Sequence, residues 1–190
     1  MNPKQVFLRT ALVVLPLAAG AAPALAGKAH QHGVAKLNIS VEAGRITLDL
    51  ESPLDNLLGF ERAPRTDAER AKTDAAVKRL RDAASLFRID SAAACVLDKV
   101  ELDSAVLQLV KAGTSPTVPT VPTAPAKGEH ADLDGHFEFK CQAGAKAGFV
   151  EVLMFDAFPG LRRIDLQIAT PRGQVKATLN RPASRVNLVR

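Results

Sequence analysis

The sequence is poor in the residue types that recognise nucleic acids. It has no tryptophan and no tyrosine, phenylalanine supplies all of its 4% aromatic content, and its basic residues are interspersed with acidic ones. Binding to nucleic acid usually requires a concentrated basic face and aromatic side chains on which bases stack. We therefore expect no nucleic-acid partner.

The sequence also lacks the signatures of common enzyme classes. It contains no Gly-x-Ser-x-Gly nucleophile elbow, no phosphate-binding loop, no dinucleotide-binding glycine motif and no His-Glu-x-x-His motif. Two acidic pairs, Asp49 with Glu51 and Asp132 with Asp134, have the spacing of one strand face, where carboxylates usually meet solvent. We expect a protein without catalytic activity; a hydrolase that uses such a pair is the least favoured alternative.

The first apolar run is too short to cross a membrane. It covers residues 11–22, whereas a transmembrane helix needs about 20 apolar residues. Lys4 and Arg9 precede the run, and the small-x-small sequence Ala24-Leu25-Ala26 follows it, as in a secretory signal with its cleavage site. We expect residues 1–26 to be a cleaved signal peptide, and the mature protein to be exported and not embedded in a membrane. An uncleaved N-terminal anchor is the alternative.

Cysteine is scarce, with only Cys95 and Cys141, which lie 46 positions apart. Neither belongs to a Cys-x-x-Cys motif, which disfavours a zinc finger or a redox-active pair. In an oxidising compartment an even pair of cysteines more often forms a disulfide than a metal site. We expect a Cys95–Cys141 disulfide; a buried free thiol is the alternative.

Alternation of apolar and polar residues predicts a chain rich in β-strands. Residues 34–51 have this pattern on both sides of a Glu-Ala-Gly turn, which predicts a β-hairpin. Residues 104–111 either continue the strand before them or turn helical. The other expected strands are 94–103, 133–141, 149–155, 163–169 and 174–180.

One main helix is expected at about residues 67–84. Thr66 and Glu69 have the spacing of a capping box, in which each side chain accepts from the other residue's backbone N–H. The apolar residues that follow at helical spacing predict one buried face. Those residues are Val77, Leu80, Ala84 and Phe87.

The predicted elements indicate an α+β fold in two β-rich lobes. The first lobe covers residues 27–111 with the helix, and the second covers residues 130–190. Residues 112–129, rich in proline and threonine, predict an extended linker. Residues 37–41 match the pattern of residues 137–141 at an offset of 100 positions, which suggests pseudo-symmetric lobes. We expect the two lobes to form one compact domain.

The four histidines form two pairs that are candidates for metal binding. His30 and His32 are spaced to share one face of a strand, and His130 or Asp132 would supply a third ligand if the lobes align. His136 is the remaining histidine. Imidazole and carboxylate donors suit Zn²⁺ and also Cu²⁺. A solvated segment with no metal role is the alternative.

Motifs along nearly the whole chain after the signal peptide resemble those of the ZrgA-like proteins. They include a His-x-His opening, a Gly-Phe-Glu motif, an aromatic-x-Phe-x-Cys strand, a Phe-Pro-Gly motif and a Thr-Pro-x-Gly-Gln turn. The matching segments are 30–37, 50–53, 56–61, 63–64, 86–87, 94–95, 137–141, 158–160 and 170–174. The resemblance implies a Gram-negative periplasmic protein that binds zinc, is associated with zinc uptake and is not an enzyme. A component of a zinc importer is then the expected partner.

Two departures from the family pattern bear on the metal. The family usually has histidine after Gly-Phe-Glu, where this chain has Arg62, whose guanidinium cannot ligate a cation. The family's long central stretch rich in His, Asp and Glu is replaced by Thr, Pro and Val. The remaining candidate ligands are His30, His32 and His130, with His136 as a lesser candidate that also suits a solvent-facing position. A structural or interaction protein that has lost most metal binding is the alternative.

Overall fold

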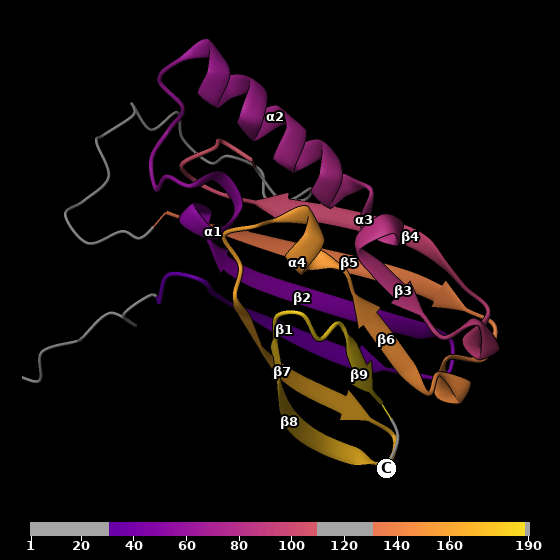
Figure 1. The fold of residues 1–190 in the computed structure, drawn as a ribbon. Helices are drawn as coiled ribbons and strands as arrows, with labels where there is room; N and C mark the ends of the chain where they lie inside the picture. The colour runs from indigo at the N-terminus through magenta and orange to yellow at the C-terminus, as the bar shows by residue number, and fades with distance from the viewer. Residues whose placement is uncertain (1–30, 110–130, 189–190) are drawn as a thin grey trace, which may run out of the picture.

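The computed structural model describes residues 31–109 and 131–188, and a six-stranded sheet is their largest element. Neighbouring strands in this sheet are antiparallel, except for β1 and β7, which are parallel (Figure 1). In sheet order the strands are β4 (Cys95–Asp103), β5 (Asp132–Cys141), β2 (Arg45–Pro53), β1 (Val34–Val41), β7 (Arg163–Thr170) and β8 (Gly173–Asn180).

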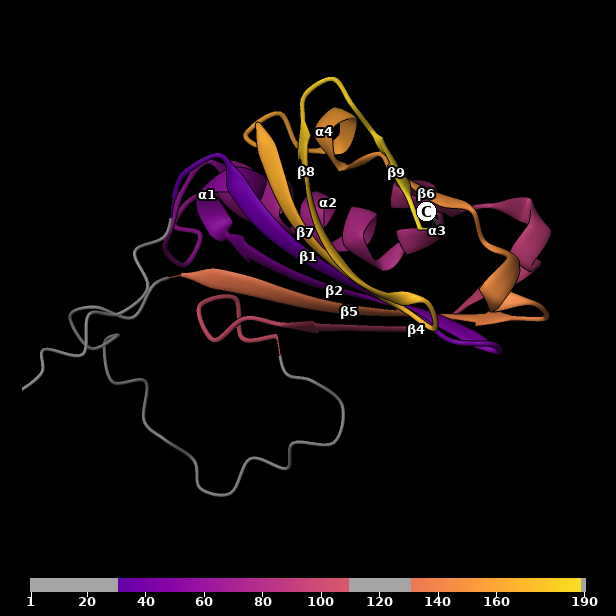
Figure 2. The same ribbon diagram turned by 90° about the horizontal axis from the view of Figure 1, so that it is seen from below.

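A second, smaller layer covers one face of this sheet (Figure 2). It contains a three-stranded sheet and helices, of which only α2 is long. No helix within the described ranges is both long and apolar enough to cross a membrane. The elements are β3 (Phe87–Ile89), β6 (Phe149–Val152), β9 (Arg185–Asn187), α1 (Leu54–Leu58), α2 (Asp67–Arg81), α3 (Ala83–Leu86), α4 (Met154–Ala157) and the 3-10 turns Ser91–Ala93 and Gly144–Lys146.

The hydrophobic core lies between the two layers. In β1, β2, β5 and β7 every second residue is buried, because one face of the large sheet packs on the second layer. The rings of Phe87 and Phe137 meet across this interface with their centroids 5.0 Å apart. The opposite face of these strands carries polar and charged side chains, so a binding site on this sheet would lie on that face.

The α+β fold class is confirmed in outline, but the sheet does not divide into two lobes. β5, from the second half of the chain, lies between β4 and β2, from the first half. The two segments that match at an offset of 100 positions, 37–41 and 137–141, lie in β1 and β5, which flank β2 and run in the same direction. The expected linker, residues 112–129, lies outside the described residues.

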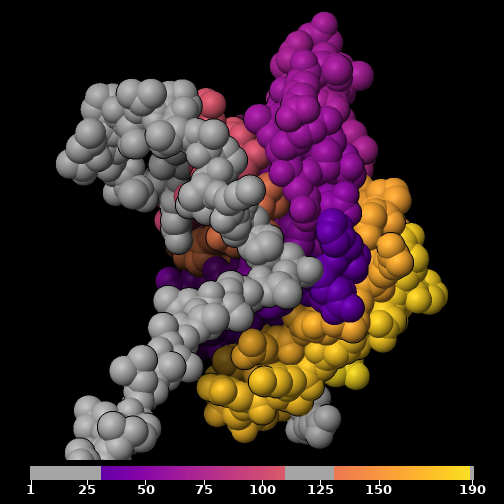
Figure 3. All heavy atoms as spheres, turned by 90° about the vertical axis from the view of Figure 1, so that its left-hand side faces the viewer, coloured from indigo at the N-terminus to yellow at the C-terminus, as the bar shows by residue number. Residues whose placement is uncertain are grey.

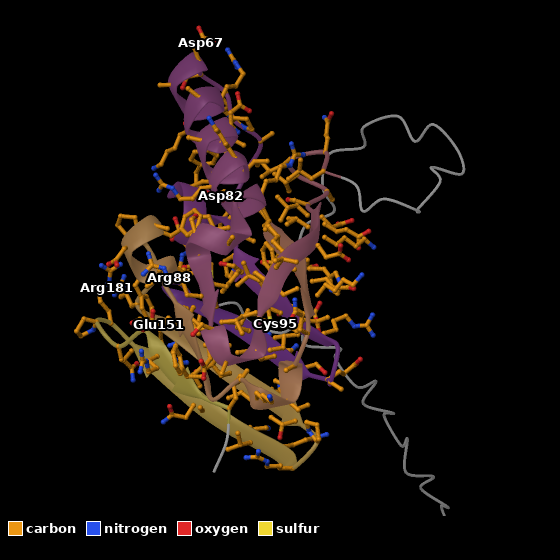
Figure 4. The ribbon with its side chains drawn as sticks, turned by 90° about the vertical axis from the view of Figure 1, so that its right-hand side faces the viewer. Asp67, Asp82, Arg88, Cys95, Glu151 and Arg181 are labelled. Atoms are coloured by element: carbon orange, nitrogen blue, oxygen red, sulfur yellow. A yellow bond between two sulfur atoms is a disulfide. The ribbon has the colours of Figure 1, made fainter. Side chains whose placement is uncertain are left out.

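Helix α2 begins at the predicted capping box. The Thr66 hydroxyl accepts from the Glu69 N–H at 3.2 Å, and the Glu69 carboxylate accepts from the Thr66 N–H. Asp67 lies at the outer end of the helix and Asp82 at the inner end (Figure 4). The helix ends at Arg81, three residues earlier than expected. Because the chain changes direction at Asp82, Ala83 is buried instead of the predicted Ala84.

Several boundaries in the rest of the chain also differ from the expectation. The expected strand 149–155 stops at Val152, and its last residues belong to α4. Residues 104–109 form neither strand nor helix, but a turn closed by a bridge between Ser104 and Leu109. In both places a compact turn brings apolar side chains back onto the core.

The expected disulfide between Cys95 and Cys141 is present. The two cysteines lie directly opposite each other in the β4–β5 pair, so the pairing of the strands brings their sulfur atoms together. Cys141 is buried and Cys95 lies at the start of β4. The disulfide therefore joins the end of β5 to the start of β4, across a separation of 46 residues.

Removing the disulfide should lower the stability of the fold. The crosslink closes a loop of 46 residues, and its loss should lower the free energy of unfolding by about 4 kcal/mol, because the unfolded chain regains that loop's freedom. Urea denaturation of the oxidised protein, the reduced protein and the Cys95→Ser/Cys141→Ser variant measures the effect. The reduced protein and the variant should agree, and a reduced protein as stable as the oxidised one contradicts the prediction.

Glu69 should give the fold a specific dependence on pH. Hydrogen bonds from Arg62 at 2.7 and 2.9 Å and from the Arg65 N–H at 2.7 Å lower the pKa of Glu69 from 4.5 to about 2. The folded state thus favours the ionised form, so this stabilisation is complete above pH 4.5 and is lost as the pH falls toward 2.

The variant Glu69→Gln tests this dependence. It should be less stable than the wild type at neutral pH, and the difference should shrink as the pH falls from about 4.5 to about 2. Thermal unfolding of both proteins across this range, without zinc, provides the measurement. Arg62→Met removes the same ion pair and should behave alike, whereas a difference that stays constant with pH would exclude the proposed cause.

Candidate metal centre

Two of the four candidate histidines lie in the described part of the chain. His32 stands just before β1, and His136 lies in the middle of β5. His30 and His130 lie outside the described residues. The convergence of residues 30, 32 and 130 on one metal ion therefore stays a prediction.

The imidazole of His32 lies between two carboxylates. Its Nδ1 is 2.8 Å from Asp55 Oδ2, and its Nε2 is 3.9 Å from Glu61 Oε1. The side chain is 60% exposed, so a solute ion can reach it. The hydrogen bond to Asp55 and the negative charge of Glu61 raise the pKa of His32 above its ordinary 6.5.

Helix α1 and the turn after it bring these two carboxylates to His32. Asp55 lies in the first turn of this short helix. The helix ends at Gly59, whose φ of 75° is in the left-handed region that glycine adopts without strain. The chain reverses there, and Glu61 follows two residues later. Sequence analysis identified the Gly-Phe-Glu motif but not its contact with the His-x-His motif, because His32 and Glu61 are 29 positions apart in the sequence.

The geometry at His32 fits a zinc ligand. A carboxylate at Nδ1 favours the tautomer with its proton on Nδ1, which leaves the Nε2 lone pair for a metal. Two donors of one tetrahedral zinc ion lie about 3.3 Å apart, given metal–ligand distances of about 2.0–2.1 Å. The 3.9 Å separation between His32 Nε2 and Glu61 Oε1 is close to that span. Asp55 thus orients the imidazole, and Glu61 offers a second donor.

His136 has a similar pair of neighbours on the open face of the sheet. Its Nδ1 is 2.7 Å from Asp49 Oδ1, and its Nε2 is 3.9 Å from Glu138 Oε2. Asp49 lies directly opposite it on β2, and Glu138 is two residues along β5 on the same face. The side chain is 25% exposed, and Glu138 also pairs with Arg45 at 3.5 Å. His136 is therefore less accessible than His32, and one of its carboxylates is shared with a cation.

Sequence analysis identified Glu51 and Asp134 as outward-facing carboxylates, but it did not place them in one row next to His136. Asp134 lies between Glu51 of β2 and Asp103 of β4 in the sheet register. Loss of hydration raises the pKa of Asp134 above its usual value, and the nearby charges of Glu51, Asp132 and Asp103 raise it further. The alternation predicted which residues face outward, but only the strand pairing places these carboxylates side by side.

The carboxylate row and His136 line a hollow of about 260 Å³ on the open face of the sheet. Lys36 pairs with Glu51 and Lys99 with Glu101, which offsets part of the negative charge. Among residues 31–109 and 131–188, no three His, Cys, Asp or Glu side chains are grouped so that they could hold a metal ion. The lining residues are Asn38, Asp49, Leu50, Glu51, Glu101, Asp103, Asp134, Gly135 and His136.

Arg62, which stands where the resemblance expects histidine, has a role in the fold. Its guanidinium donates to Glu69 and lies 5.2 Å from the centroid of the Phe60 ring. The pairing with Glu69 ties the turn after α1 to the first turn of α2, and the contact with Phe60 lies within the turn itself. Arg62 therefore supports the segment that carries Glu61, but it supplies no ligand for a metal ion.

Comparison with known proteins agrees with these motifs. A family model described as ZrgA family zinc uptake protein matches residues 29–188, which is most of the chain. No curated protein matches the sequence at a significant level. The matched range includes His32, α1, the turn to Glu61 and His136. The chain belongs to the ZrgA family of zinc uptake proteins.

Proposed function

We propose that this chain is an exported periplasmic protein that binds Zn²⁺ and supports zinc acquisition or buffering without catalysing a reaction. The observation that carries the proposal is the geometry of His32, whose Nδ1 is held by Asp55 while Nε2 faces Glu61. Zinc is the cargo in this role. The family description and the zinc-compatible donors at His32 support the same function.

The proposed ligands are histidines His30, His32 and His130, with Glu61 as a nearby carboxylate donor. The described residues supply His32 and Glu61, and the remaining donors come from outside them. His136 with Asp49 is a separate, lesser candidate, because its side chain is more buried and the neighbouring Glu138 is shared with Arg45. A zinc importer component is the proposed recipient of the metal.

Loss of His32 should weaken zinc binding. The mature protein, starting after residue 26, should bind Zn²⁺ with micromolar or tighter affinity. His32→Ala should weaken that affinity at least about tenfold, which is about 1.4 kcal/mol. The variant removes the Nε2 donor that Asp55 orients and that faces Glu61. His30→Ala/His32→Ala should weaken it further. Competition with a chromophoric chelator measures each affinity, and parallel titrations with Cu²⁺ test the alternative metal.

His136→Ala provides the matched control. It removes an imidazole that also lies between an aspartate and a glutamate, Asp49 and Glu138, at a place where we expect only weaker binding. The tightest zinc-binding event should keep its affinity in this variant. An affinity that falls with His136→Ala and not with His32→Ala would move the principal site to the sheet face. A wild-type protein that binds no zinc at micromolar concentration would contradict the proposed function.

A second candidate function is that of a structural or interaction protein that has lost most metal binding. Arg62 favours it, because a position expected to supply a ligand instead pairs with Glu69. The two functions differ in the response of the fold to zinc. Binding at 100 times the dissociation constant stabilises a folded protein by about 2.7 kcal/mol. The metal-binding function therefore predicts a clear rise in melting temperature with zinc, and the second candidate predicts none.

A further inference from the structure

The backbone immediately after His32 is held by one buried side chain, Asn56 of α1. Asn56 Oδ1 accepts from the Gly33 N–H at 2.6 Å, and Asn56 Nδ2 donates to the Val34 carbonyl at 2.9 Å. Only 2% of Asn56 is exposed. A single amide thus satisfies two backbone groups on consecutive residues.

The same backbone is held from the other side by the residues that lead into β7. The Gly33 carbonyl accepts from the N–H groups of Arg162 and Arg163 at 2.8 and 3.0 Å. Gly33 has a φ of +81°, and a β-carbon there would lie 3.1 Å from the Arg162 side chain. The positive φ therefore favours glycine, and a β-carbon would also press on the Arg162 side chain. The peptide next to His32 is fixed on both sides, although the imidazole itself is exposed.

Asn56 is in turn fixed by the Phe-Pro-Gly motif of the second half of the chain. A β-carbon at Gly160 would lie 2.5 Å from the Asn56 carbonyl oxygen, so these two backbones are in close contact. Arg181 donates to the carbonyls of Phe155 and Leu161, on either side of that motif. In Figure 3 the first described residues (indigo) lie between the magenta helical region and the orange and yellow C-terminal half. Three motifs of the family therefore meet at Asn56.

We propose that Asn56 is a positioning residue for zinc capture. It does not contact the ion; it sets the place of His32 relative to Asp55 and Glu61 by holding the peptide that follows His32. Two adjacent residues of α1 position His32: Asp55 orients its imidazole, and Asn56 orients the backbone that follows it. A ligand held before the metal arrives loses less conformational freedom on binding. This inference rests on the proposed function and adds a residue to it.

The test separates positioning from a purely structural role. Asn56→Ala should weaken zinc affinity about tenfold, the lower end of the effect seen when groups that orient metal ligands are removed. Ser52→Ala is the matched control: its hydroxyl accepts from Asn56 Nδ2 at 3.3 Å in the same buried place, and its hydrogen bonds within the described residues are to Pro53 and Asn56, not to residues 32–34. Val150→Ala, in the distant strand β6, lowers stability without touching α1. Both controls should lower the melting temperature and keep the wild-type zinc affinity.

A second measurement needs no variant. In the zinc-free wild type, the Gly33 amide should exchange with deuterium much more slowly than an unstructured amide, because its hydrogen is bonded to Asn56. If Asn56→Ala does not fold, Gly33→Ala replaces it: the strain at positive φ should move the His32 peptide and also weaken zinc affinity about tenfold.

The outcomes distinguish this inference from the function on which it rests. Normal zinc affinity in Asn56→Ala, or free exchange of the Gly33 amide in the zinc-free wild type, overturns the positioning role and leaves the zinc function intact. Weakened affinity in Ser52→Ala and Val150→Ala to the same degree as in Asn56→Ala also overturns it, because the effect then follows stability alone. A wild type that binds no zinc overturns both.

Discussion

The pairing of β2 with β5 is the interaction on which the rest of the structure depends. It joins the two halves of the chain, from Arg45 opposite Lys140 to Pro53 opposite Asp132. On its inner face it places Ile46 and Leu48 against the two phenylalanines of β5, in the core. On its outer face it places Asp49 beside His136. The other edge of β5 pairs with β4, and the register of this second pair brings the two cysteines together.

This pairing explains what the sequence could and could not predict. Alternation is local, so the strands of the hairpin and the buried face of β5 were predictable, and so was the capping box at Thr66 and Glu69. The placement of β5 beside β2 depends on contacts between residues about 80 to 95 positions apart, for which one sequence carries no local signal. The two-lobe expectation rested on the proline-rich stretch 112–129 and on the match at an offset of 100 positions. The sheet instead inserts β5 between two earlier strands.

The candidate site likewise has one residue that the sequence could predict and others that it could not. His32 could be identified from residue type and spacing, because imidazoles two residues apart form a recognisable pair. Its partners could not, since Asp55 and Glu61 reach it only after α1 folds back against the start of β1. Asn56 carried even less signal, because a buried asparagine resembles any other polar residue until its partners are known. Three of the family motifs meet at this end of the sheet, through Gly33, Asn56 and Gly160.

The two histidines with similar neighbours differ in what surrounds them, and this difference bears on function. His136 lies on the face of a rigid sheet, among carboxylates that already pair with Lys99, Lys36 and Arg45. A metal arriving there competes with these cations, and moving a carboxylate means disturbing strand neighbours. His32 lies just before the start of β1, with an exposed side chain on a fixed peptide. The proposed zinc ligand is thus accessible to a solute ion and is held in place by the fold.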